Sequence, residues 1–227
     1  MTVESSDPLL KYREQHKNRL SYMPWLYWRL KPKHKEWAQA WQQEYQDYLQ
    51  SMESVQIGKD CFISPDAHLF AEPNRDIIIG DGSFIAADCV LHGPITLGKQ
   101  VALNHHCTLD GGRKGIHISD NARLAAYCHI YAFNHGMKLD STIHEQAVSS
   151  TGIQIGKDVW LGANVGVVDG VNIEDFAVIG MDSTVTRHVE AYAIMAGSPA
   201  KKTGIGATRN NFSAFTGLSF YYSIIYL

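Results

Sequence analysis

The sequence predicts an all-β solenoid, in which the chain winds into about six stacked triangular coils. Aliphatic side chains recur every six residues over most of the chain, a period that fits neither a helix nor an alternating strand. A second small or apolar residue follows most of them four positions later, so each side of a coil has two inward positions. The repeat comprises Ile57, Ile63, Leu69, Ile79, Ile85, Leu91, Leu97, Leu103, Leu109, Ile118, Leu124, Ile130, Ile155, Leu161, Val167, Ile173, Ile179 and Val185.

The breaks in this repeat indicate the size of one coil. They fall after Leu69, Leu109 and Ile130, between groups of three aliphatic positions. Each group of about 18 residues is therefore interpreted as one three-sided coil, and the extra residues are expected to bulge from one corner. At the spacing of neighbouring β-strands, about 4.8 Å, six coils form a rod roughly 29 Å long.

The ends of the repeat divide the chain into three segments. Residues 1–54 lack the repeat and are predicted to form an N-terminal helical segment. Residues 55–203 form the repeat domain. Residues 204–227 are a hydrophobic C-terminal tail that is expected to dock on the rod or on a partner.

The N-terminal segment is predicted to contain two helices. Asp7 and Pro8 suit the cap and first turn of the first helix. The second is expected to bury an aromatic face against the rod or a neighbouring subunit, since its large side chains recur at steps of three or four. Residues 25–35 are also compatible with a membrane-surface or acceptor-binding role. The aromatic face comprises Trp37, Trp41, Tyr45, Tyr48 and Met52.

Composition narrows the class of protein. The net charge of −3 gives no reason to expect nucleic acid as a partner. No apolar run reaches the ~18 residues needed to cross a bilayer, and the N-terminal sequence lacks the apolar core of a signal peptide. We therefore expect a cytoplasmic protein without a transmembrane segment. The four cysteines all occupy second inward positions and are expected to be packing residues: Cys61, Cys89, Cys107 and Cys128.

Chemistry is expected where the repeat is violated. Asn134 takes the place of a small apolar residue at a second inward position, and His135 follows it at the start of the largely polar stretch 136–152. This stretch is predicted to be a protruding corner loop, and histidine is suited to accepting a proton near neutral pH. Asp110 lies one coil before Tyr131 on the same side of the prism. It is interpreted either as a group that orients a base or binds an acceptor hydroxyl, or as a turn-former.

Three motifs follow one another along the chain, and the first contains Asn134 and His135. They are HIYAFNH at 129–135, IGKDVWLG at 155–162 and AGSPAK at 196–201. Together with the repeat, they resemble the hexapeptide-repeat acyltransferases, in particular the maltose, galactoside and capsular-sugar O-acetyltransferase branch, over about residues 55–203. The resemblance implies a left-handed parallel β-helix and a homotrimer with active sites between adjacent subunits. It also implies acetyl-coenzyme A as the acyl donor and a hydroxyl acceptor, such as a sugar.

The resemblance assigns roles to individual residues. His135 matches the family's catalytic base, Asn104 matches an asparagine that contacts the acceptor sugar, and Trp160 matches a tryptophan beside the coenzyme A arm. Asp110, Tyr131 and Asn134 are further candidates for substrate contacts. Family positions that line the coenzyme channel fall on Ala163, Met181, Thr186, Arg187 and Lys201. The N-terminal segment matches none of the family's acceptor contacts, so the acceptor stays open.

Three other functions compete with this assignment. Asn134-His135-Gly136-Met137 also resembles xenobiotic acetyltransferases of the chloramphenicol or streptogramin type, for which a large apolar acceptor cleft is expected. A zinc protein similar to the γ-class carbonic anhydrases is a further alternative, and a scaffold without catalytic activity is the last. The zinc ligands in that alternative would come from His92, His106, His129 and His135.

Overall fold

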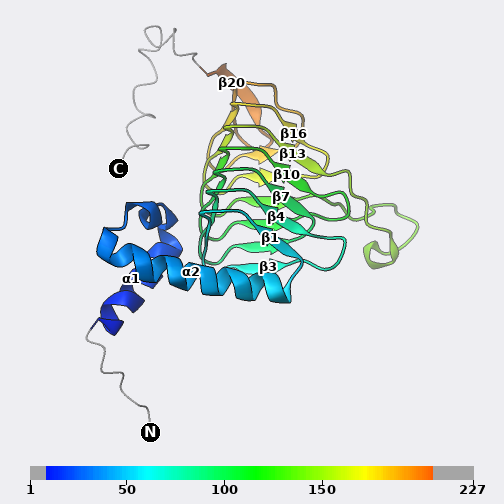
Figure 1. Cartoon of the computed structure of the whole chain (residues 1–227). Coiled ribbons are helices and arrows are strands. Elements are labelled where there is room, and N and C mark those ends of the chain that lie inside the picture. Colours follow the sequence, from blue (N-terminus) through cyan, green and yellow to red (C-terminus); the bar gives the residue numbers. More distant parts are fainter. Residues whose placement is uncertain (1–8, 207–227) are drawn as a thin grey trace.

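A computed structural model describes residues 9–206. From Val55 onwards the chain winds into a triangular prism, and each coil contributes one short strand to each of three sheets (Figure 1). Within residues 9–206 the strands of a face pair in parallel, except the last pair, β19 with β20, which is antiparallel. The structure therefore confirms the predicted solenoid of about six coils.

The strands are short, and consecutive strands belong to different faces. The first face contains β1 (Val55–Ile57), β4 (Ile77–Ile79), β7 (Ile95–Leu97), β10 (Ile116–Ile118), β13 (Ile153–Ile155) and β16 (Asn172–Ile173). The second face contains β2 (Phe62–Ile63), β5 (Phe84–Ile85), β8 (Ala102–Leu103), β11 (Arg123–Leu124), β14 (Trp160–Leu161), β17 (Val178–Ile179), β19 (Ala193–Ala196) and β20 (Lys201–Ile205). The third face contains β3 (His68–Phe70), β6 (Val90–His92), β9 (Thr108–Asp110), β12 (His129–Tyr131), β15 (Gly166–Val167) and β18 (Thr184–Val185).

The register shows how the repeat becomes the core. Leu97 pairs with Ile79 on one side and Ile118 on the other, so equivalent positions of successive coils stack. We call the corner between the first and second faces the first corner, the next the second corner, and the one leading to the following coil the third corner. All three breaks in the repeat precede a return to the first face, so the extra residues bulge at the third corner.

The four cysteines lie inside the prism, as predicted, and all are free thiols. Cys107 Sγ donates to the carbonyl of Ala125 at 3.1 Å, and Cys128 Sγ donates to that of Gly162 at 3.3 Å. Burial raises the pKa of the Cys61 thiol, and the adjacent Cys107 thiol together with burial raises the pKa of Cys128. These thiols stay protonated at neutral pH and serve as packing residues.

The helices α1 (Leu10–Tyr22) and α2 (Pro32–Met52) are joined by a 3-10 turn, η1 (Pro24–Arg29), and α2 runs across the first coil (Figure 1). Gln42 pairs with the edge of β2 as a neighbouring strand would: its Nε2 donates to Ile63 O at 3.1 Å, and its Oε1 accepts from Ile63 N at 2.8 Å. Gln46 Nε2 donates to Cys61 O at 2.9 Å. The second helix therefore closes the open end of the prism, where an unpaired strand edge would otherwise remain.

The prediction of which face of this helix is buried is wrong: the buried face is rotated about the helix axis from the predicted one. Its buried residues are Ala38, Gln42, Gln46 and Leu49, whereas Tyr48 is 60% and Met52 65% exposed. The physical reason is that the end of the solenoid presents backbone amides, which amide side chains satisfy better than aromatic ones. The partly buried members of the predicted face, Trp37, Trp41 and Tyr45, flank the buried stripe.

The expected cap at Asp7 and Pro8 and most of the C-terminal tail lie outside the described residues. At the far end of the prism, the β19–β20 hairpin follows the last coil. Within residues 9–206, no helix has the length and apolar character that a bilayer-spanning segment requires.

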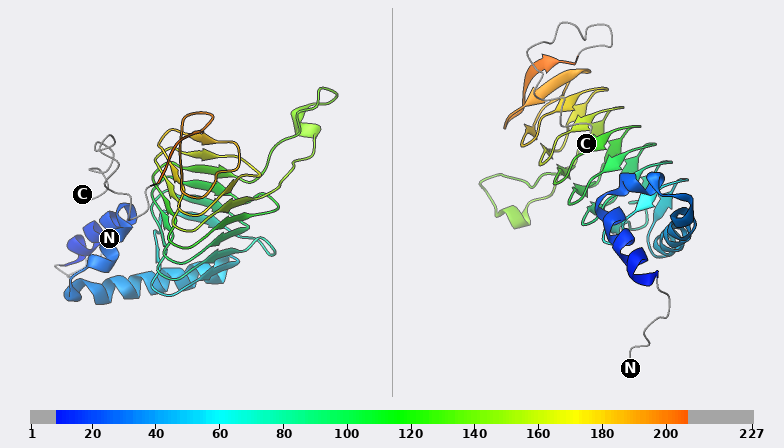
Figure 2. Two further views of the ribbon diagram at one scale, coloured as in Figure 1. Left: turned by 90° about the horizontal axis from the view of Figure 1, so that it is seen from above. Right: turned by 90° about the vertical axis from the view of Figure 1, so that its left-hand side faces the viewer.

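The stretch 136–152 leaves the third corner as a long loop, as predicted (Figure 2). Its stem is an antiparallel bridge: Asn134 N donates to Ser149 O at 2.8 Å, and Ser149 N donates to Asn134 O at 2.9 Å. The expectation of an inward Asn134 is wrong, because this bridge carries Asn134 out of the coil and leaves it exposed. Ala132 is the last buried residue before the loop.

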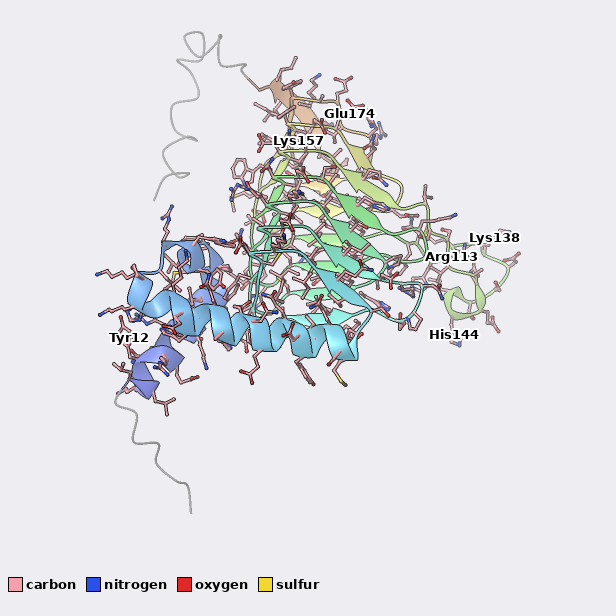
Figure 3. The ribbon with its side chains drawn as sticks, viewed as in Figure 1. Tyr12, Arg113, Lys138, His144, Lys157 and Glu174 are labelled. Carbon is pink, nitrogen blue, oxygen red and sulfur yellow. The ribbon has the colours of Figure 1, made fainter. Side chains whose placement is uncertain are left out.

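Side chains organise the loop. Gln146 accepts from Lys138 N at 2.8 Å and donates from its Nε2 to Lys138 O at 2.9 Å. The short turn η2 (Ile143–Glu145) is held by Thr142 and the carboxylate of Glu145. Figure 3 shows Lys138 and His144 out on this loop, away from the prism. The loop is therefore an ordered arm with a rigid stem.

Candidate active site at the third corner

His135 lies exposed at the base of the loop. The ring of Phe133 is 6.0 Å from the His135 ring at an interplanar angle of 76°, and 6.0 Å from the Tyr131 ring on its other side. Such edge-to-face contacts restrict the rotamers of an imidazole that would otherwise be free. Tyr131 pairs with Asp110 in the register of the third face, which confirms their predicted stacking.

Asp110 uses its two carboxylate oxygens differently. Oδ1 accepts from the backbone N–H of Gly112 at 2.9 Å, so the turn-forming interpretation is correct. Oδ2 lies 3.3 Å from His92 Nδ1, and His92 Nε2 lies 3.6 Å from Glu72 Oε2. The carboxylate therefore also faces a titratable side chain, which gives the third corner a second acid–base couple.

The contact between Asp110 and His92 was missed in the sequence, where His92 stood only among zinc candidates. A signal for it exists, since the two residues are 18 positions apart and pair directly across β6 and β9. Outward residues that are one coil apart, with no break in the repeat between them, lie above one another on the surface. Their inward neighbours stack in the same way in the core. Outward side chains that are one coil apart in the sequence are therefore expected to be neighbours on the surface.

The residues matched to acceptor and coenzyme contacts lie elsewhere. Asn104 is at the second corner, where its Nδ2 donates to Leu124 O at 2.9 Å. Trp160 is on β14 and 38% exposed, and Met181 is exposed at the second corner two coils later than Leu124. Lys201 is exposed on β20 at the end of the second face.

A cluster of titratable side chains adjoins Asn104. Tyr22 of α1 donates to Asp88 Oδ2 at 2.7 Å, and His106 Nε2 lies 3.6 Å from the same oxygen. The Nδ1 atoms of His105 and His106 are 3.0 Å apart. Burial, and then the neighbouring His106, lower the pKa of His105. From the sequence, His106 was considered only as a possible zinc ligand and His105 was not singled out, because nothing local links them to Tyr22.

The predicted site residues thus fall into two groups on either side of the third face. Between them lies one side of the prism, which begins with the turn at residues 105–106 and continues as the strand β9, a span of roughly 15 Å. The third corner holds Asp110, Tyr131, Asn134, His135, Thr186 and Arg187. The second face and second corner hold Asn104, Trp160, Ala163, Met181 and Lys201. One chain does not bring His135 and Asn104 together.

Two hollows lie away from both groups. A polar hollow of about 470 Å³ follows the first corner beside Asp81 and Asp120, and a second of about 290 Å³ lies among the N-terminal helices. None of the residues assigned to catalysis, acceptor or coenzyme contacts by the family resemblance lines either hollow, whereas residues of the stretch 25–35 line both. Among residues 9–206, no three histidine, cysteine or acidic side chains converge on a possible metal site. The four histidines of the zinc alternative are therefore dispersed within one chain.

Comparison with known proteins links this architecture to acyl transfer. Residues 152–187 match the family described as the hexapeptide repeat of succinyl-transferase. A probable macrolide acetyltransferase of Lysinibacillus sphaericus is 36% identical over 118 residues, which are 50% of this chain and 64% of that protein. A chloramphenicol acetyltransferase of Klebsiella aerogenes is 54% identical over 48 residues, 21% of this chain and 23% of that protein. The chain spans less than two thirds of the length of these curated relatives.

Solved structures share the fold. The N-acyltransferase AntD from Bacillus cereus, in complex with dTDP and 3-hydroxybutyryl-CoA, is 25% identical with a TM-score of 0.62, over 71% of this chain and 88% of that chain. A maltose O-acetyltransferase from Clostridium difficile is 20% identical with a TM-score of 0.53, over 89% of this chain and 90% of that chain. The second likeness concerns the fold alone.

Proposed function

Because this chain belongs to the hexapeptide-repeat acyltransferase family, we propose that it transfers the acetyl group of acetyl-coenzyme A to a hydroxyl group of a small, sugar-like acceptor. The observation that carries the proposal is the placement of His135, exposed at the root of an ordered loop on a rigid coil stack. Loops held by rigid scaffolds are common places for catalytic side chains.

In the proposed reaction, His135 acts as the general base. It takes the proton of the acceptor hydroxyl as the oxygen attacks the thioester carbonyl, and backbone N–H groups stabilise the tetrahedral oxyanion. The carbon–sulfur bond then breaks, and the imidazolium returns its proton to the departing thiolate of coenzyme A. Atoms and charges balance without an acyl-enzyme intermediate. Contact with Phe133 holds the imidazole in place for both proton transfers.

The donor is assigned to the coenzyme contacts that the family resemblance implies. Arg187 and Lys201 are exposed cations that suit the phosphates of coenzyme A, and Trp160 offers a partly exposed ring to the rest of the molecule. The AntD complexes with coenzyme A and 3-hydroxybutyryl-CoA support an acyl-coenzyme A donor for this fold. Ala163, Met181 and Thr186 complete the proposed channel. Because Thr186 and Arg187 lie at the third corner and the other residues lie on the second face and second corner, the two groups would come from neighbouring chains.

The proposed site is shared between subunits of a homotrimer. A flat-sided prism provides one wall of a groove, and a second copy of the chain provides the other. His135 and Asn104 lie on opposite sides of the third face, so both can reach one acceptor only if they come from different chains. The loop also exposes apolar side chains, which a neighbouring subunit would cover. These are Met137, Leu139, Ile143 and Val148.

A xenobiotic acceptor is the second candidate. It is favoured by the identity to chloramphenicol acetyltransferases over 48 residues, and by the match to the probable macrolide acetyltransferase. The exposed apolar side chains of the loop suit an apolar acceptor as well as a neighbouring subunit. Acceptor amines belong in the same screen, because AntD is an N-acyltransferase.

The function is tested by screening acceptors for acetyl-coenzyme A-dependent release of free thiol. Sugars, hydroxylated antibiotics and amino sugars should be compared, and the proposal predicts turnover with at least one hydroxyl compound. His135→Ala should lower kcat by about 10²–10⁴, the usual contribution of a general base. The matched control is His144→Ala, on the exposed part of the same loop, which should keep full activity. Residual turnover of His135→Ala within about tenfold of the parent would remove His135 from the role of base.

A further inference from the structure

The N-terminal helices enclose a hollow of about 290 Å³ that the proposed acetyl transfer does not use. It lies between α1, η1 and the first turn of α2, remote in the chain from the loop that carries His135. Its floor is apolar, with Leu20 fully buried and Leu26 and Leu30 partly buried. Four basic side chains stand around it: Arg19, Arg29, Lys31 and Lys33.

Within the described residues 9–206, these cations have no anionic counterpart in the hollow. No carboxylate lines it, and none of the ion pairs among residues 9–206 involves Arg19, Arg29, Lys31 or Lys33. Like charges held close together repel one another, and a bound anion relieves that repulsion. All four side chains are exposed, so they are free to turn toward a ligand.

The backbone adds to the positive potential. The helix α2 begins at Pro32, has no side-chain cap at Lys31 and has no acidic residue in its first turn. The N-terminus of a helix carries partial positive charge, which a nearby acid usually offsets and which Lys33 increases here. Burial, followed by the charges of Lys33, His16 and Lys31, lowers the pKa of His34. The surroundings of His34 are therefore electropositive.

Rings form the remaining wall. Tyr12 of α1 lies beside the start of α2 (Figure 3), with its ring 4.2 Å from that of His16 and 5.2 Å from that of His34. The His34 imidazole is held between Tyr12 Oη, 3.4 Å from its Nε2, and the indole N–H of Trp37, 3.4 Å from its Nδ1. The wall thus offers ring surface beside a group of cations.

We infer that this hollow, lined by Tyr12 and ringed by Arg19, Arg29, Lys31 and Lys33, binds a phosphate ester with an apolar or aromatic body. The cations and the helix N-terminus take the phosphate, while the leucine floor and the tyrosine ring contact the body of the ligand. A soluble phosphate ester and the headgroup of an acidic phospholipid share this chemistry. The inference is independent of the proposed acetyl transfer, because it concerns different residues.

The test measures binding to the full chain by calorimetry. The probes are phenyl phosphate, inorganic phosphate, and vesicles of phosphatidylglycerol or of phosphatidylcholine. Lys31→Gln/Lys33→Gln should weaken phenyl phosphate binding by about tenfold or more, because two charge-assisted contacts are lost. The matched control, Lys11→Gln/Lys35→Gln, removes the same charge from exposed positions of α1 and α2 outside the hollow, and binding should stay within about twofold.

Tyr12→Ala separates the two halves of the proposed ligand. It should weaken phenyl phosphate and leave inorganic phosphate unchanged, so equal affinities of the parent for these two probes would overturn the apolar part. Binding of phosphatidylglycerol vesicles alone, with the same dependence on Lys31 and Lys33, supports a lipid headgroup as the source. Equal loss in both double variants, or no binding of any phosphate probe, would refute the site. All five substituted side chains are exposed, so unchanged thermal unfolding confirms that each variant is folded.

Discussion

A complementation experiment tests whether the active site is shared between chains. His135→Ala and Asn104→Ala chains are produced together with different tags, and assemblies that carry both tags are isolated. Within one chain His135 and Asn104 are separated by the width of the third face, roughly 15 Å. If a single acceptor touches both, the two side chains come from neighbouring subunits, and a mixed trimer can contain intact sites although every chain is defective.

The expected magnitude follows from counting. A trimer that carries both tags contains two chains of one variant and one of the other. In either arrangement one of its three sites joins His135 of an Asn104→Ala chain to Asn104 of a His135→Ala chain, so about one third of the sites are intact. The His135→Ala trimer should retain about 10⁻²–10⁻⁴ of the parent activity. The Asn104→Ala trimer should retain roughly a tenth, the cost of one lost hydrogen bond to the acceptor. The average of the two separate variants is then about 5% of the parent, well below the expected value of about 33%.

The assay measures kcat/KM for the acceptor. The rate of free thiol release is recorded at low acceptor concentration. The control mixes the two variants after each has assembled, so that chains cannot exchange, and it should give only the average of the separate activities. Activity of the co-assembled protein at or below that average would refute the shared site. A fully active monomer in light scattering, near the chain mass of 25.3 kDa, would refute it independently.

Three further predictions concern the rod. Gln42→Leu should lower the free energy of unfolding by about 2–5 kcal/mol in chemical denaturation, because it leaves the buried N–H and C=O of Ile63 unpaired; Gln43→Leu, at an exposed position of the same helix, is the control, and equal effects would contradict the closing role of α2. Cys107→Ala should lower that free energy by about 1 kcal/mol and leave turnover unchanged, and rapid labelling of Cys107 in the native protein would show that it is not core. The hydrogen bond from the backbone N–H of Lys59, and then the Lys99 ammonium, lower the pKa of Asp81, so the stability that this carboxylate contributes is present above its ordinary pKa and is lost as the pH falls through the lowered value. The temperature of thermal unfolding should therefore fall less steeply with decreasing pH in Asp81→Asn than in the parent. Identical slopes would contradict the lowered pKa.

The coils, the core and the position of the loop were predictable because a solenoid repeats one local rule. Each coil packs mainly on its neighbours, so the position of Leu97 determines that of Ile79 and Ile118 above and below it. The same rule placed the cysteines inside the prism and paired Asp110 with Tyr131. The pairing of His92 with Asp110 could have been predicted in the same way, because the two residues are 18 positions apart. It was missed because the repeat was applied mainly to inward positions.

The sequence by itself therefore determined the solenoid, its register and the corner from which the loop leaves. Only the tertiary structure decided how the prism is closed and what surrounds it. The buried stripe of α2 carries Gln42 and Gln46 where the pattern of aromatic residues predicted another face, and Tyr22 meets Asp88 across 66 residues. Each of these contacts occurs once and joins the helical segment, which lacks the repeat, to the solenoid. The repeat therefore cannot predict them. Backbone groups at the end of a solenoid must be satisfied by whatever segment covers them, and that requirement becomes visible only when the whole chain is folded.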